Sequence, residues 1–348
     1  MFLVDKYKPT SKEEILFHHD TYDQLEKMAQ DNSLQHIIFH GPSGSGKTTM
    51  INIFLQMLFG KEIYNTYTVE YEVKSSNNKS NHEKIIRSDY HVIIKPTQTN
   101  YDRHMLQYVV KDYAKRIEFG SISTRQKFKI IQIDDLDNFG HIPQASIIRT
   151  IENYSESCRF IMCCESLSKV ILPIRSRCMC IAVPSLTDKE LFGVLCQITA
   201  NEKVSLPLKD LREIVSKSDG QLKPALWNTQ LKILGIDTEI EYKKTVKKLV
   251  ETILKGDPAL HDTVIRDILS KFMITMIPHK IIFKDMMNII SETELDDEVL
   301  IKITSKVAEC EHDCARGRRP SIHMDKMVIS IMNIINNNRN NVKKCEKN

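Results

Sequence analysis

The chain has 348 residues, of which 41% are hydrophobic, so it can bury a sizeable core and its length suggests two or three domains. Its 49 lysines and arginines nearly balance 45 aspartates and glutamates, and a net charge of +4 argues only weakly for a nucleic-acid partner. No segment has the pattern of a membrane span or a secretory signal, and the nine cysteines follow no disulfide framework. We therefore expect a soluble, intracellular protein with reduced thiols.

In the first half of the chain, short apolar runs alternate with amphipathic stretches. The runs include HIIF, YHVIIK, FKIIQI, RFIMCC and CMCIAV, and helical patterns such as TTMINIFLQMLF and ASIIRTIENY lie between them. This alternation predicts an α/β fold in which a parallel sheet is covered by helices on both faces.

From about residue 184 onward the patterns are helical only. LTDKELFGVLCQITANE and LKDLREIVSKS predict a small helical domain over 184–240, after a first domain over 1–183. EYKKTVKKLVETILKG ends at a glycine, as helices often do, and similar patterns continue to about Asn336. They predict a third, all-helical domain over 241–348, whose polar end NNNRNNVKKCEKN we expect to be frayed.

Residues 41–48 read GPSGSGKT and fit the phosphate-loop pattern G-x-x-x-x-G-K-[ST]. In this pattern backbone N–H groups wrap the phosphates, while Lys47 reaches the terminal ones and Thr48 can hold Mg²⁺. The apolar run before the motif and the helical pattern after it supply the strand and the helix that such a loop requires. The sequence therefore predicts a nucleotide-binding site.

The stretch FKIIQIDDLDNF reads as a buried strand that ends in Asp134, Asp135 and Asp137. Carboxylates at the end of a strand beside a phosphate loop typically hold Mg²⁺ and polarise the attacking water. The alternative interpretation is a solvated acidic turn without a catalytic role.

Several stretches together resemble replication factor C, the sliding-clamp loader of the AAA+ ATPases. They are VDKYKPT, GPSGSGKT, IIQIDDLD, SCRFIMCCESLSKVILPIRSRC and GQLKPALW, and they span nearly the whole chain. SDYHVIIKP and CEHDCARGRRPSIHMDKM are most similar to the small subunit at the end of the five-subunit arc. The resemblance implies a RecA-like AAA+ core, a small helical lid and a helical collar that joins the subunits.

The resemblance also implies what such a chain does. With the other subunits of a hetero-oligomer it opens a ring-shaped sliding clamp and places it at a primer–template junction, in the nucleus or at a cytoplasmic DNA replication site. ATP binding assembles the grip and hydrolysis releases it, so ATP or ADP with Mg²⁺ are the implied cofactors, and no membrane is involved.

Individual residues receive roles from the same resemblance. Thr48 and Asp134 are the implied Mg²⁺ ligands, and Asp135 is the implied water-orienting residue. Arg177 is expected to point into the neighbour's ATP site, where its permanent charge and forked shape suit a transferred phosphoryl group. The alternative for it is an intrachain salt bridge, a role for which Arg175 is the more natural candidate. The implied nucleotide-binding residues are Val4, Tyr7, Pro9, Gly41, Pro42, Ser43, Gly44, Ser45, Gly46, Lys47, Thr48, Thr49 and Lys223.

Three positions depart from the family's pattern. Asp135 stands where Glu is usual, which draws the carboxylate back by about 1.5 Å, and a misplacement of about 1 Å can cost roughly a hundredfold in rate. Glu165 stands at the sensor position, usually Asn, where a carboxylate pointed at a terminal phosphate would cost about 4 kcal/mol at about 4 Å with an effective dielectric of about 20. Either Glu165 turns away, or it binds extra Mg²⁺, or the site favours a diphosphate. Lys223 replaces an arginine and loses its forked geometry. We therefore expect slow hydrolysis or none; a fully active ATPase and a non-hydrolysing scaffold are the alternatives.

Other residues carry weaker predictions. Met57 and Phe59 end an apolar helix that lies on the clamp face in the family, so clamp contact is predicted, with ordinary core packing as the alternative. Arg149 is the DNA-binding candidate, because the family tracks duplex phosphates from a matching helix; a solvated or intersubunit role is the alternative. The stretch CEHDC matches no common zinc spacing, and we expect no metal there.

Overall fold

The computed structural model of the chain describes most of its residues. These are residues 1–30, 34–74, 80–96, 102–115, 128–155, 157–236, 241–256, 264–275, 277–293, 295–317 and 319–345. The chain divides into two compact units, Met1–Ile236 and Asp237–Asn348, and each unit is built around apolar clusters of its own.

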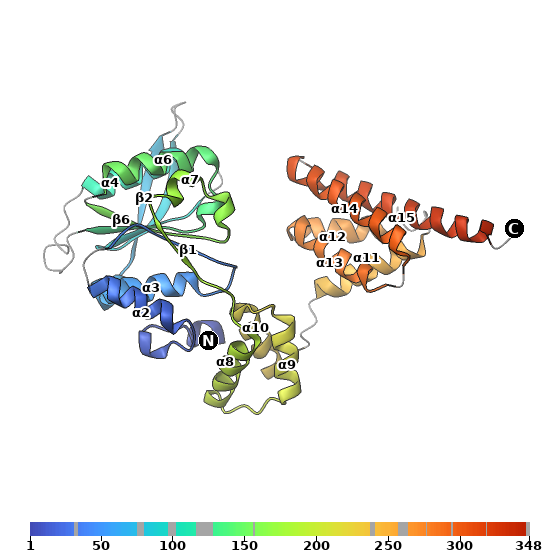
Figure 1. The fold of residues 1–348 in the computed structure, drawn as a ribbon, viewed down its shortest axis with the longest axis horizontal. Helices are drawn as coiled ribbons and strands as arrows, with labels where there is room; N and C mark the ends of the chain where they lie inside the picture. The colour runs from blue at the N-terminus through green and yellow to red at the C-terminus, as the bar shows by residue number, and fades with distance from the viewer. Residues whose placement is uncertain are drawn as a thin grey trace. The chain divides into compact units, whose positions relative to one another are not determined.

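The described residues of the first unit form a seven-stranded sheet in the order β2-β3-β4-β5-β6-β1-β7, drawn in Figure 1. The strands are β1 (Ile37–His40), β2 (Tyr67–Lys74), β3 (Ser80–Arg87), β4 (His91–Ile94), β5 (Lys129–Ile133), β6 (Cys158–Cys164) and β7 (Met179–Ala182). Five neighbouring strands from β4 to β7 in this order are parallel, whereas β2 and β3 add an antiparallel hairpin at one edge. The predicted α/β fold is therefore confirmed, and the sheet also carries this antiparallel edge.

Helices cover both faces of this sheet (Figure 1). On one face lie α2 (His19–Gln30) and α3 (Lys47–Phe59), and on the other lie α4 (Asp102–Lys115), α6 (His141–Asn153) and α7 (Leu172–Arg175). Successive side chains of β6 alternate between the two apolar clusters: Ile161 packs on the α3 side, and Phe160 and Met162 pack on the α4 and α6 side. Because both faces are buried, the parallel strands read as continuous apolar runs in the sequence.

Three helices after the sheet pack around a separate apolar cluster together with the N-terminus of the chain. They are α8 (Asp188–Asn201), α9 (Leu208–Lys217) and α10 (Leu222–Ile233), joined by α1 (Leu3–Lys6). Leu3 is buried there, its backbone N–H donates to Gln230 Oε1 at 3.1 Å, and the rings of Phe2 and Trp227 lie 4.9 Å apart between centroids. The N-terminal segment thus packs on the predicted lid, a long-range contact that the apolar pattern did not indicate. The boundary between residues 183 and 184 stays a prediction.

Local signals explain where several helices begin and end. Thr187 and Glu190 form a capping box at the start of α8, in which Thr187 N–H donates to Glu190 Oε2 at 2.9 Å. Gly60 ends α3 with a positive φ of 82°, and its N–H donates to the Gln56 carbonyl at 2.8 Å. These short-range features are readable from the sequence because each involves residues within one helical turn.

The described residues of the second unit are helical. They form α11 (Glu241–Lys255), α12 (Arg266–Ile274), α13 (His279–Ser291), α14 (Asp297–Arg316) and α15 (Pro320–Cys345) around one apolar cluster. The all-helical character predicted for this part of the chain is confirmed, although α15 continues to Cys345 through most of the tail that we expected to be frayed. Across the described stretches, every helix is too short or too polar to cross a membrane.

Candidate nucleotide-binding site

The phosphate-loop motif forms the turn between β1 and α3. Gly44 and Gly46 have positive φ angles of 77° and 92°, a left-handed conformation that glycine adopts without strain. At Gly41 a Cβ atom would lie 2.0 Å from the carbonyl oxygen of Val183, at the end of β7. The glycines are therefore needed by the backbone itself, and the turn places the N-terminus of α3 at the loop, an arrangement that suits an anion such as phosphate.

Lys47 lies in the first turn of α3 and points back across the loop. Its Nζ donates to the carbonyl oxygens of Gly41 and Pro42, each at 2.8 Å. An ammonium group has three donors, so one remains for a phosphate oxygen. Thr48 follows it on the same turn and is exposed, as a hydroxyl that meets a metal–nucleotide complex must be.

Asp134 directly follows β5 and is buried, with 7% of its surface exposed. Its Oδ1 accepts a hydrogen bond from Gln132 Nε2 at 2.9 Å, and Lys95 Nζ lies 3.8 Å from its Oδ2. Among the described residues no three His, Cys, Asp or Glu side chains are arranged to hold a metal ion. Mg²⁺ with a nucleotide needs only one or two carboxylates besides the phosphates, so the oxygen ligands of Asp134 and Thr48 suit such an ion chemically, and their role as its ligands stays a prediction.

Asp135 has a left-handed backbone, with φ 50° and ψ 49°. Burial and the negative charges of Asp134, Asp137 and Glu165 raise the pKa of its carboxyl, while Lys95 acts in the opposite direction. Asp135 and Glu165, which both depart from the family's pattern, therefore contribute to one region of negative charge. A raised pKa makes a carboxylate a better proton acceptor, so the negative charge around Asp135 does not by itself weaken a general base; it would instead repel the terminal phosphate of a bound nucleotide.

Asp137 has a supporting role that the sequence did not reveal. It is 9% exposed, its Oδ1 accepts from the Glu165 backbone N–H at 3.3 Å, and Lys169 Nζ lies 3.8 Å from its Oδ2. Glu165 follows β6, and its own side chain is exposed. Asp137 thus fixes the backbone at the sensor position, instead of offering its carboxylate to a ligand.

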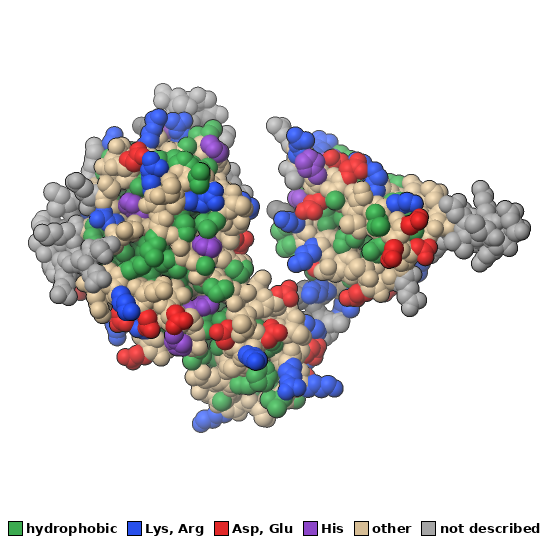
Figure 2. Space-filling model, viewed as in Figure 1, with side chains coloured by type: hydrophobic (Ala, Val, Ile, Leu, Met, Phe, Trp, Pro, Cys, Tyr) green, Lys and Arg blue, Asp and Glu red, His purple; other side chains and the backbone are tan. Residues whose placement is uncertain are grey.

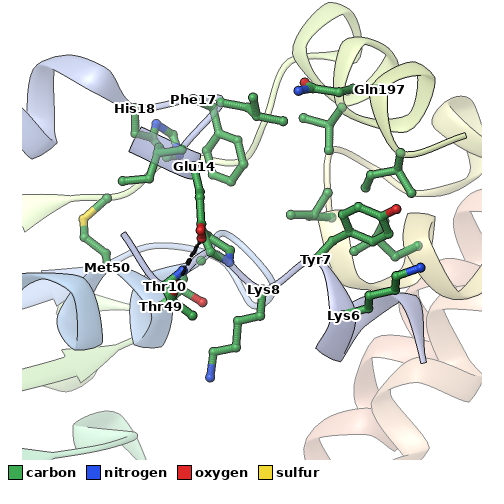
Figure 3. Close-up of a pocket in the computed structure, with 18 of the residues that line it drawn as sticks. Lys6, Tyr7, Lys8, Thr10, Glu14, Phe17, His18, Thr49, Met50 and Gln197 are labelled. Carbon is green, nitrogen blue, oxygen red and sulfur yellow. Dashed lines mark hydrogen bonds between the residues drawn. The ribbon is translucent and has the colours of Figure 1, made fainter. Parts of the chain in front are cut away.

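A cavity of about 440 Å³ opens beside the phosphate loop. Its walls come from the N-terminal segment, from Ser45, Gly46 and Thr49 at the start of α3, and from the lid helices. Figure 3 shows Tyr7 from the N-terminal segment and Gln197 from α8 at this cavity. Its size and its place next to the loop fit a nucleobase with its ribose.

The wall residues include several that the sequence did not single out. Glu14, Phe17, His18 and Gln197 line the cavity, as do the predicted Tyr7 and Pro9. Glu14 Oε2 accepts from the Thr10 backbone N–H at 2.7 Å, which turns its carboxylate along the cavity wall (Figure 3). Val4, also predicted, packs against the apolar cluster of the lid and is absent from the wall.

Tyr7 is held by a residue far away in the sequence. Glu202 Oε1 accepts from Tyr7 Oη at 2.7 Å and from Lys6 Nζ at 2.6 Å. Burial and this hydrogen bond raise the pKa of Tyr7, and the bonds from Lys6 and Tyr7 lower the pKa of Glu202. The end of α8 thereby anchors the N-terminal segment at the cavity.

The lid approaches the loop through the start of α10. Gln221 Cβ would lie 3.5 Å from a Cβ atom at Gly44, which is ordinary van der Waals contact. Lys223 stands two residues further on and is exposed. Its position beside the phosphate loop agrees with the nucleotide contact that the sequence predicts for it, a contact that stays a prediction.

Arg177 lies at the opposite edge of the sheet from the phosphate loop. β1 and β7 are parallel with Ile37 opposite Met179, so Arg177 precedes the amino end of β7 while the loop follows the carboxyl end of β1. The Arg177 guanidinium forms a salt bridge to Glu152, with Nη2 2.7 Å from Oε1. The intrachain salt bridge expected of Arg175 is thus found at Arg177, whereas Arg175 Nε is buried with no hydrogen-bond partner in the described part of the chain.

Two predictions concern contacts with other molecules: the clamp contact of Met57 and Phe59, and the DNA contact of Arg149. Phe59 is 8% exposed and stacks on Tyr90 with ring centroids 5.2 Å apart, which favours core packing, the alternative that the sequence left open, and its clamp contact stays an untested prediction. Met57 is only half-buried, and its clamp contact stays a prediction. Arg149 is exposed on α6, and Figure 2 shows lysines and arginines interspersed with acidic side chains on the face that it draws.

The loop after β1, the carboxylates after β5 and the helical lid beside a base-sized cavity define a nucleotide-binding protein of the AAA+ class. Residues 17–187 match the family model described as DNA polymerase III, delta subunit. A protein of Acanthamoeba polyphaga mimivirus that is named as a replication factor C small subunit is 32% identical, over 98% of this chain and 93% of its own. The chain belongs to the replication factor C small-subunit family, whose members are clamp-loader components.

Cellular relatives agree with this placement. Replication factor C subunit 3 of Homo sapiens is 27% identical over 94% of each chain, and subunit 5 of Saccharomyces cerevisiae is 27% identical over 94% of this chain and 98% of its own. Among solved structures, the Holliday-junction branch-migration motor RuvB of Thermotoga maritima matches 72% of this chain and 82% of its own, at 16% identity and a TM-score of 0.48. The curated relatives confirm the family resemblance inferred from the sequence motifs.

Proposed function

We propose that this chain binds ATP or ADP with Mg²⁺ in a five-membered clamp loader, turns the nucleotide over slowly, and supplies Arg177 to the ATP site of the adjacent subunit. The complex opens a ring-shaped sliding clamp and places it at a primer–template junction, in the nucleus or at a cytoplasmic replication site. Membership of the family supports a hetero-oligomeric clamp loader. The clamp, the DNA and the identity of the nucleotide belong to the proposal.

Slow turnover at the chain's own site is supported by the reach of one carboxylate and the charge of another. Nucleotide binding is supported by Lys47, which donates to carbonyls of the loop, and by Asp134, which is buried and accepts a hydrogen bond from Gln132. The catalytic half is weakened, because the short side chain of Asp135 draws its carboxylate back and Glu165 adds negative charge that would repel a terminal phosphate. Nucleotide retention is therefore favoured over hydrolysis.

The observation that carries the role in trans is the position of Arg177 at the amino edge of the sheet. Ile37, opposite Met179, stands four positions before Gly41, which is about 13 Å along an extended strand. Arg177 lies still further from Gly41, since it precedes Met179. Its partner Glu152 is in the last turn of α6, a helix that starts after β5 and runs back for about 20 Å toward the amino edge. An arginine at that edge cannot serve its own phosphate loop, but it is accessible to a neighbouring chain.

The test is ATP turnover by the reconstituted complex with clamp and primed DNA. Lys47→Ala and Arg177→Ala are compared in this subunit alone, with Arg212→Ala, an exposed arginine on α9, as the matched control. We expect Arg177→Ala to remove much of the turnover and Lys47→Ala to leave it nearly intact. If Lys47→Ala is the more damaging change and Arg177→Ala is harmless, the subunit is an ordinary ATPase acting in cis. If both changes are harmless, its nucleotide and its arginine have only a scaffold role.

A further inference from the structure

The salt bridge between Arg177 and Glu152 occupies the part of the arginine that recognises phosphate. Arg177 Nη2 and Nε donate to Glu152 Oε1 at 2.7 and 3.1 Å, and Nη1 donates to the Pro173 carbonyl at 3.0 Å. The Nε and Nη2 donors form one fork of the guanidinium, and such a fork is what matches two oxygens of a phosphate. The fork cannot face Glu152 and a neighbour's nucleotide in the same geometry.

The backbone that carries Arg177 is held independently of this salt bridge. Gln144, buried at the start of α6, accepts from Ile171 N–H at 3.0 Å and donates to the Lys169 carbonyl at 3.2 Å. The Arg177 backbone N–H donates to the Ile174 carbonyl at 3.1 Å. A change at Glu152 therefore acts on the direction of the Arg177 side chain and leaves its place in the fold unaltered.

The salt bridge between Arg177 and Glu152 can break and re-form because both side chains are exposed to solvent. The side chains of Arg177 and Glu152 are 40% and 50% exposed, so water and salt weaken their attraction. A phosphate group carries more negative charge than one carboxylate and presents several acceptor oxygens, so it can displace Glu152 from the guanidinium.

We propose that Glu152 is a positioning residue that holds Arg177 against its own chain until the nucleotide of a neighbouring subunit competes for the guanidinium. The inference rests on the proposed role of Arg177 in trans and adds a regulator to it. Free subunits thereby keep the arginine paired, and assembly around a nucleotide releases it.

The experiment measures kcat/KM for ATP in the reconstituted complex with clamp and primed DNA, with changes in this subunit only. Glu152→Gln keeps the shape and an acceptor but removes the charge that competes with phosphate. We expect kcat/KM to rise about two- to fivefold, the range open to an exposed ion pair. The rise is expected to shrink at high salt, and to disappear when Glu152→Gln is combined with Arg177→Ala.

Glu213→Gln is the matched control, because Glu213 forms a salt bridge of similar exposure to Lys217, at 2.6 Å on α9. It is expected to leave kcat/KM unchanged. If Glu152→Gln has no effect, or lowers kcat/KM, while Arg177→Ala is damaging, the positioning role is wrong and the role in trans stands. An effect of Glu152→Gln that persists in the Arg177→Ala background also overturns the positioning role. An Arg177→Ala variant with normal turnover overturns both proposals.

Discussion

Replacing Asp135 by glutamate tests whether a short carboxylate limits this subunit's own hydrolysis. The extra methylene extends the carboxylate by about 1.5 Å, one carbon–carbon bond. A misplacement of a catalytic group by about 1 Å can cost roughly a hundredfold in rate. Extending the carboxylate to the length of a glutamate therefore raises turnover at this site by at most about that factor. Glu165 keeps its negative charge close to the site, so we expect an increase of about tenfold.

The same substitution has a structural cost that the backbone explains. Asp135 has φ 50° and ψ 49°, a left-handed conformation that short polar side chains tolerate better than long ones. We expect Asp135→Glu to lower the free energy of unfolding by about 1 kcal/mol. Faster turnover combined with a slightly less stable fold is the specific result that this geometry predicts.

The assay is ATP turnover by the reconstituted complex, in which the difference made by Lys47→Ala isolates the contribution of this site. That difference is measured with Asp135 and with Asp135→Glu, and Glu165→Asn in each background separates the effect of charge from that of reach. If Asp135→Glu binds nucleotide normally and the Lys47-dependent turnover does not change, the reach of the carboxylate is not limiting, and the reasoning is refuted.

Three further predictions concern the cavity, the loop and the core. Glu202→Gln weakens the anchor of Tyr7 and is expected to lower nucleotide affinity roughly two- to fivefold, measured by titrating the full chain with a fluorescent nucleotide. Gly41→Ala places a Cβ atom 2.0 Å from the Val183 carbonyl oxygen, so we expect a loss of about 1–3 kcal/mol in urea unfolding together with weak nucleotide binding. Burial lowers the pKa of His91 to about 4, from an ordinary value of 6.5. As the pH falls from 6.5 to 4, the unfolded chain takes up the proton first, so His91 lowers stability across that window by up to about 3 kcal/mol. Burial also lowers the pKa of His36 to about 4, so His91→Phe is expected to reduce the dependence of stability on pH without abolishing it, in urea titrations at several pH values.

Each of these predictions has an outcome that contradicts it. Unchanged nucleotide affinity in Glu202→Gln means that Tyr7 does not need its anchor at the cavity. Normal stability of Gly41→Ala means that the loop relaxes away from β7. A His91→Phe variant with the same loss of stability on acidification as the natural chain assigns that loss to other groups.

Much of the nucleotide site was readable from the sequence because its parts are local. The glycines, Lys47 and Thr48 lie within one turn and the first residues of one helix, and a parallel sheet brings Asp134 to the same edge whenever β1 and β5 both lie inside it. Alternating apolar runs sufficed for the α/β class, since strands buried on both faces cannot carry polar residues at regular intervals.

The tertiary structure alone decided which distant side chains meet. Glu202 lies 195 positions from Tyr7, and Glu152 lies 25 positions from Arg177, so neither pairing leaves a periodic trace in the sequence. An aromatic residue at the end of an apolar helix, such as Phe59, can lie in the core or contact a partner protein. Only the stacking of Phe59 on Tyr90 in the folded chain places it in the core. Periodicity specifies which face of an element is apolar, whereas the partners of a charged or aromatic side chain depend on how separate elements pack against one another.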